Sequence, residues 1–115
     1  MKNLFGDRAS RRVLDLFAEL SQIPRSSGNE GGVADWLVRF AKEHHLDCYR
    51  DMQNNVLLRY IPEHAEHAPL LLQGHTDMVC VREPCSTHDF SVEPLELFLD
   101  ENGRLGAKGT SLGAD

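Results

Sequence analysis

A histidine and an aspartate stand two residues apart, directly after a continuous apolar run. The run covers residues 69–73, Gly74 follows it, and His75 and Asp77 come next. In extended backbone, side chains two residues apart point to the same side, so we expect the Asp77 carboxylate beside the His75 imidazole. A carboxylate in that place fixes the ring orientation and the tautomer that a metal-binding histidine needs. The alternative is a structural histidine followed by a turn aspartate, which the short motif taken alone favours.

A glycine-rich segment leads to a second carboxylate. Glycines recur among small residues over 106–113, and Asp115 closes the segment. A phosphate-binding loop needs a lysine directly before Ser or Thr, but Gly109 separates Lys108 from Thr110. The better interpretation is a flexible loop that delivers Asp115 to a divalent cation, where one carboxylate can bridge two ions.

Two amphipathic helices are predicted upstream of these motifs. Residues 10–21 carry apolar side chains at near-helical spacing, and Pro24 closes that region. Residues 30–45 carry a second apolar stripe. Ser10 and Asn29 are the expected N-caps, because their side-chain oxygens can accept from unpaired amides of the first turn. The first stripe consists of Val13, Leu14, Phe17 and Leu20, and the second of Val33, Trp36, Leu37, Phe40 and Ala41.

Short strands are predicted in the rest of the chain. The strand-like stretches are 48–50, 56–61, 69–73, 96–100 and 105–108. The continuous apolar run of 69–73 is typical of a strand covered on both faces. The last two stretches predict a hairpin, with Asn102 and Gly103 at a turn that favours positive φ. Helices before a buried central strand indicate an α/β fold.

Composition excludes several classes of protein. The chain has 115 residues, with 12 Lys and Arg against 18 Asp and Glu, which gives a net charge of −6. An acidic balance without a basic block argues against a nucleic-acid partner. No apolar run approaches the ~20 residues of a membrane-spanning helix, so we expect no membrane partner. Three cysteines make no disulfide framework, and without an export signal we expect a reduced, cytoplasmic protein.

Taken together, the motifs resemble the aminoacyl-histidine dipeptidases. The likeness is carried by residues 75–79, 88–90 and 109–115, and by the loop 23–30 with the helix after it. That family belongs to the dinuclear zinc peptidases, together with carboxypeptidase G, aminoacylases and carnosinases. The likeness covers essentially the whole chain.

The resemblance implies a role for three residues. His75 would be a ligand of one metal ion, Asp77 would be the catalytic carboxylate that clamps His75, and Asp115 would bridge both ions. In the family two Zn²⁺ ions activate a water, with a Glu as general base, and Mn²⁺ or Co²⁺ can bind the same ligands. The substrates are dipeptides with a free amino end, often of the Xaa-His type. The family fold is an α/β/α mixed-sheet catalytic domain with a smaller lid domain for dimerisation, so the parent hydrolase is expected to be a homodimer.

The chain departs from the family pattern after Asp115. The glutamate pair, a further carboxylate ligand, the distal histidine and the lid domain are absent from the sequence. We therefore expect residues 1–115 to be the N-terminal fragment of the metallopeptidase catalytic domain, a single and incomplete domain that is inactive alone. Strand edges left uncovered favour poor solubility or self-association.

Two alternatives to a dipeptidase fragment stay open. The chain is then either a non-catalytic interaction module or a weak binder of a single metal ion through His75 and Asp77. Among the other histidines and cysteines, we expect a solvated loop for His64 and His67, and a buried thiol for Cys80. A zinc knot formed by Cys80, Cys85 and His88 would lack a fourth ligand.

Overall fold

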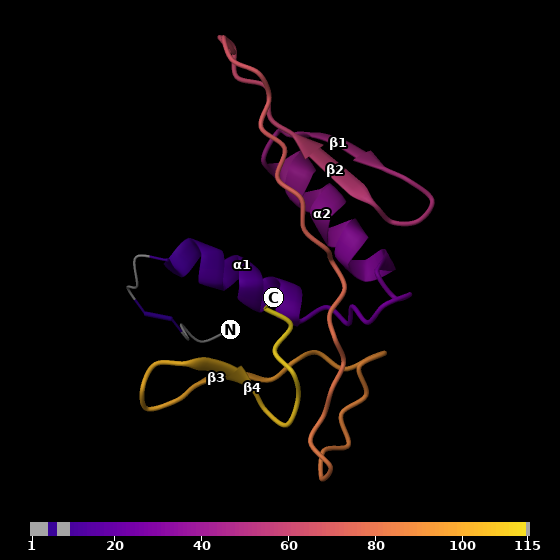
Figure 1. The fold of residues 1–115 in the computed structure, drawn as a ribbon, viewed down its shortest axis with the longest axis vertical. Helices are drawn as coiled ribbons and strands as arrows, with labels where there is room; N and C mark the ends of the chain where they lie inside the picture. The colour runs from indigo at the N-terminus through magenta and orange to yellow at the C-terminus, as the bar shows by residue number, and fades with distance from the viewer. Residues whose placement is uncertain (1–4, 7–9, 115) are drawn as a thin grey trace.

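The chain folds into two helices and two small antiparallel hairpins (Figure 1). The structure is a computed structural model that describes residues 5–6 and 10–114. Helices α1 (Arg11–Ser21) and α2 (Gly31–Glu43) come first. They are followed by strands β1 (Asp47–Arg50), β2 (Val56–Arg59), β3 (Leu97–Leu99) and β4 (Leu105–Ala107). The predicted α/β class is confirmed.

Helix α1 buries a narrower face than its apolar pattern predicts. Ala18 and Ser21, one turn apart, are its buried residues. The Ser21 hydroxyl donates to the Phe17 carbonyl oxygen at 2.8 Å, so this polar side chain is satisfied in the core. Val13, expected in the apolar stripe, is 68% exposed. Ser10 occupies the N-cap position as predicted, but its side chain makes no capping hydrogen bond.

Helix α2 contributes three buried residues and packs against the first hairpin. Val33, Ala34 and Ala41 are its buried residues, as expected of a helix with one apolar face. The predicted cap at Asn29 is wrong, because the helix begins at Gly31 with Glu30 in the N-cap position. Glu30 instead folds back and accepts from the Gly28 amide at 2.7 Å.

The first hairpin lies along α2 (Figure 1). Its register pairs Asp47 with Arg59 and Arg50 with Val56. The Asp51 carboxylate closes the turn, accepting from the Asn55 amide and from its side chain at 2.9 and 2.8 Å. The predicted strand 48–50 is thus confirmed, and the predicted strand 56–61 is shorter than expected.

The second hairpin lies beside α1 (Figure 1). The predicted turn is present, but only Gly103 has a positive φ, of 74°. Asp100 accepts from the Arg104 amide at 2.7 Å and fixes this turn. The segment before β3 is anchored to α1, because the Leu95 amide donates to the Ser21 carbonyl oxygen at 2.9 Å. Leu95 itself is buried.

The predicted buried strand at 69–73 is wrong. The segment is extended beside α2 (Figure 1), but it joins no sheet in the described chain. Leu70, Leu71 and Leu72 are 84%, 74% and 84% exposed. Their apolar character still suits a strand covered on both faces, and the described residues provide no second strand or layer to cover it.

The described fold is loosely packed. Its radius of gyration is 16.2 Å, against about 13 Å for a compact domain of this length. Among the described residues, no helix is long and apolar enough to cross a membrane. The buried residues lie on the two helices, in the segment before β3, and at Phe5, Arg25 and Met78.

Candidate functional site

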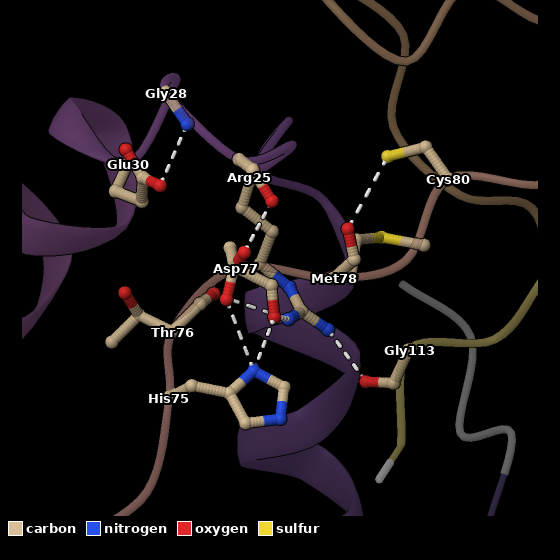
Figure 2. A network of polar contacts seen from close by, with 10 residues as sticks. Arg25, Gly28, Glu30, His75, Thr76, Asp77, Met78, Cys80 and Gly113 are labelled. Atoms are coloured by element: carbon tan, nitrogen blue, oxygen red, sulfur yellow. Dashed lines mark hydrogen bonds and ion pairs between the residues drawn. The ribbon is translucent and has the colours of Figure 1, made fainter.

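The His75 ring and the Asp77 carboxylate lie side by side (Figure 2). His75 Nδ1 is 3.1 Å from Asp77 Oδ1 and 3.0 Å from the Asp77 carbonyl oxygen. Both neighbours are acceptors, so Nδ1 must carry the proton and Nε2 holds the ring lone pair. This is the tautomer with which a histidine binds a metal through Nε2.

A serine from a distant loop holds the other oxygen of Asp77. The Ser27 hydroxyl donates to Asp77 Oδ2. This hydrogen bond, followed by the contact with His75, keeps the pKa of the Asp77 carboxyl below its usual range. The carboxylate is therefore ionised at neutral pH and oriented from both sides.

The Arg25 side chain underlies the turn that carries His75 and Asp77. Arg25 is buried, and its guanidinium donates to the carbonyl oxygens of Thr76 and Asp77, both at 3.2 Å. It also donates to the Gly113 carbonyl oxygen at 2.7 Å (Figure 2). One side chain thus joins the His75 turn to the segment that leads to Asp115.

The backbone of the same loop pairs with the turn. The Met78 amide donates to the Arg25 carbonyl oxygen at 3.0 Å, and Ser26 and Met78 form a parallel bridge. Met78 is buried at this junction. The 25–26 loop is thus joined to the chain directly after Asp77 by an isolated bridge, whereas the run before His75 is unpaired in the described residues.

Asp115, the predicted bridging ligand, lies outside the described residues. The residues before it, Gly113 and Ala114, line the same cleft as His75 and Asp77. The cleft has a volume of about 1450 Å³, and apolar side chains of α1, α2 and the 69–72 segment also line it. This volume is larger than the about 300–1,000 Å³ of a typical small-molecule site, because the exposed 69–72 segment forms one wall.

The described residues form no complete metal centre. No group of three or more His, Cys, Asp or Glu side chains in this part of the chain is arranged to hold an ion. Cys80 is only partly exposed, and burial raises the pKa of its thiol. Cys85 is exposed, whereas the His88 ring packs edge-on against Phe90. The zinc-knot alternative therefore finds no support in the described residues.

Sequence reasoning found the His75 and Asp77 pair but not its supports. Arg25 and Ser27 were assigned only to a loop that resembles the family. Their contacts with the turn span about 50 residues of sequence, and no local periodicity reports such a contact. The only signal in the sequence is that polar and charged side chains, Arg25 and Ser27, occur together in one short loop.

Dipeptidases are the class of protein that this fold and sequence match. The chain is 36% identical over 104 residues to the cytosol non-specific dipeptidase of Escherichia coli (strain K12). The matched region covers 88% of this chain and 21% of that protein. The chain is also similar to the crystal structure of aminoacylhistidine dipeptidase from Vibrio alginolyticus, with a TM-score of 0.85 and 30% identity. That match covers 95% of this chain and 22% of the solved one. No protein-family model matches the chain.

The chain thus spans about a fifth of the length of both relatives. The predicted resemblance to the aminoacyl-histidine dipeptidases is confirmed, and the α/β fold matches a segment of theirs.

Proposed function

We propose that this chain contributes part of the metal site of a dipeptide hydrolase. The observation that carries the proposal is the ordered pair of His75 and Asp77, with Nδ1 and Oδ1 3.1 Å apart and Ser27 on the other oxygen. Both relatives described above are named as dipeptidases. In this proposal residues 1–115 form one incomplete unit of a metallopeptidase catalytic domain that acts on dipeptides of the Xaa-His type in the cytoplasm.

The donor atoms present suit a metal-binding histidine. Asp77 holds the Nδ1 proton of His75 and so directs the Nε2 lone pair toward an ion. Asp115 is the proposed carboxylate that bridges two ions. Zn²⁺ accepts imidazole and carboxylate ligands, with Mn²⁺ or Co²⁺ as alternatives.

When bound, a pair of such ions polarises the substrate carbonyl and lowers the pKa of a coordinated water. The chain's own part is to position the ligands: Asp77 orients His75, and Ser27 orients Asp77. The described residues supply too few ligands to close a site, so we expect the 115-residue chain alone to bind metal weakly and to hydrolyse no dipeptide.

Calorimetric titration with ZnCl₂ tests the proposal. We expect His75→Ala to lower the affinity about tenfold or more. His64→Ala is the matched control, because His64 is exposed in the 62–69 connection and should leave the affinity unchanged. Equal affinities for the wild type and His75→Ala would remove His75 from the site, and turnover of β-alanyl-histidine by this chain would contradict the expected inactivity.

A second candidate function is favoured by the exposed leucines at 70–72. These residues are extended and have no backbone hydrogen-bond partner among the described residues, so they present an open strand edge. We propose a second copy of this chain as the partner of that edge. Sedimentation velocity would then show a concentration-dependent dimer in place of a monomer.

A further inference from the structure

We propose that Arg25 is a positioning residue that holds the His75 turn and the Gly113 segment in register, so that the two proposed ligand segments face one cleft. The inference rests on the proposed function for its meaning. It concerns a residue to which neither the sequence motifs nor the resemblance gives a role.

The contacts of Arg25 are unusual in their spread. Its guanidinium donates to Thr76 and Asp77, 51 and 52 residues away, and to Gly113, 88 residues away. Arginine presents five donors in a rigid planar fork, so one side chain can serve carbonyls from two separate segments. The residue is 7% exposed, so these hydrogen bonds are largely shielded from water.

The junction around Arg25 is packed without spare room. A Cβ placed on Gly113 would lie 2.9 Å from Arg25 Nη2 and 2.9 Å from Met78 Cβ. Gly113 also has a φ of 66°, which side-chain-bearing residues rarely adopt. Only glycine therefore lets the 113 segment approach the guanidinium closely enough for its carbonyl to accept at 2.7 Å.

The backbone of Arg25 adds a second tie to the same turn. Its carbonyl oxygen accepts from the Met78 amide at 3.0 Å, directly after Asp77. Main chain and side chain of one residue thus fix both ends of the stretch 76–78. The stretch carries the Asp77 carboxylate, so a shift of Arg25 would move the partner of the His75 ring.

Lysine cannot replace this geometry. An ammonium group carries its donors on one nitrogen, whereas Arg25 serves the His75 turn from Nη1 and the Gly113 segment from Nη2. We therefore expect Arg25→Lys to preserve the charge and to release the Gly113 segment. Arg82→Lys is the matched control, because Arg82 is exposed and donates to one loop carbonyl, that of His88, at 2.8 Å.

The test is nitrogen-15 NMR of the full chain with and without Zn²⁺. In Arg25→Lys we expect a mixed tautomer of His75, a shifted Gly113 amide resonance and about a tenfold loss of zinc affinity. Arg82→Lys should change none of these. An Arg25→Lys protein that is folded by circular dichroism and keeps all three signals would overturn the proposal.

Two further measurements keep the proposal testable. If Arg25→Lys does not fold, the wild type should show slow rotation of the Arg25 guanidinium, and a freely rotating group would overturn the inference. Gly113→Ala should reproduce the change in the His75 tautomer from the other side of the junction. The tautomer and amide signals need no metal, so they report on Arg25 even if the wild type binds no zinc and the proposed function fails.

Discussion

Asp77 is held on both of its carboxylate oxygens. His75 approaches Oδ1 within 3.1 Å, and the Ser27 hydroxyl donates to Oδ2. An aspartate fixed in this way can set the tautomer of its histidine neighbour without a metal being present. The orientation of the His75 ring therefore depends on Ser27 as well as on Asp77.

Ser27→Ala should raise the pKa of Asp77 toward its ordinary value. The hydrogen bond from Ser27 is the largest cause that lowers this pKa, and it stabilises the ionised form. Carbon-13 NMR titration of the Asp77 carboxyl group measures the change. Ser26→Ala is the control, because Ser26 meets the turn through its backbone. A pKa that stays unchanged in Ser27→Ala would contradict the described contact.

At the scale of elements, the exposure of a helix position decides how much its side chain contributes to the free energy of unfolding. Val33 on α2 is 2% exposed, whereas Val13 on α1 is 68% exposed. The two residues are of one type and both were predicted to be apolar stripe positions, so the structure separates them where the pattern could not.

Val33→Ala should lower the free energy of unfolding by about 2 kcal/mol, because two buried methyl groups are lost and a cavity is left. Val13→Ala should change it by less than about 0.5 kcal/mol. Urea unfolding followed by circular dichroism measures both. Equal effects of the two substitutions would contradict the described packing of the helices.

The turn of the first hairpin predicts a pH dependence. The side-chain hydrogen bond from Asn55 lowers the pKa of Asp51 in the folded chain, aided by the Asn55 and Gln53 amides. A depressed folded pKa adds stability above the unfolded value of about 3.9, and this is lost as pH falls through the folded value.

Asp51→Asn should therefore flatten the loss of thermal stability on acidification below about pH 4. Melting temperatures of the wild type and the variant across that range provide the measurement. Asp47→Asn is a suitable comparison, because Asp47 pairs with Arg59 on the exposed surface of the same hairpin. A wild type and an Asp51→Asn variant with parallel acid profiles would contradict the prediction.

The sequence predicts both helices, the second hairpin and the two strand stretches of the first because their signals are local. Apolar spacing marked α1 and α2, and the turn at Gly103 marked the second hairpin. The predicted cap at Asn29 is wrong because the helix begins at Gly31 with Glu30 in the N-cap position, and the Asn29 side chain instead donates to the Ser91 carbonyl oxygen. The predicted strand at 69–73 is wrong because an apolar run shows only that a segment suits burial on both faces. In the described chain no second strand or layer covers these residues.

At the scale of the whole molecule, the exposed leucines at 70–72 and the large radius of gyration both show that the described chain is loosely packed. The apolar segment 70–72 is exposed, and the cleft beside it is lined by α1 and α2 side chains. The two relatives are about four times as long as this chain. An apolar strand without neighbours is a template for pairing with another chain.

Leu71→Lys should shift the chain toward the monomer. Leu71 is 74% exposed at the centre of the unpaired run, so a charge there opposes strand pairing without disturbing the core. Met52→Lys is the control, because Met52 is fully exposed in the turn of the first hairpin. Sedimentation velocity measures both, and a wild type that stays monomeric at all concentrations would contradict the proposed self-association.

The most direct test of the account is a crystal structure of this chain soaked with ZnCl₂, with anomalous data collected at the zinc edge. The account predicts an anomalous peak bonded to His75 Nε2 and to the Asp115 carboxylate, with Asp77 still on His75 Nδ1. A peak elsewhere, or side chains of His75 and Asp115 that point away from each other, would contradict it.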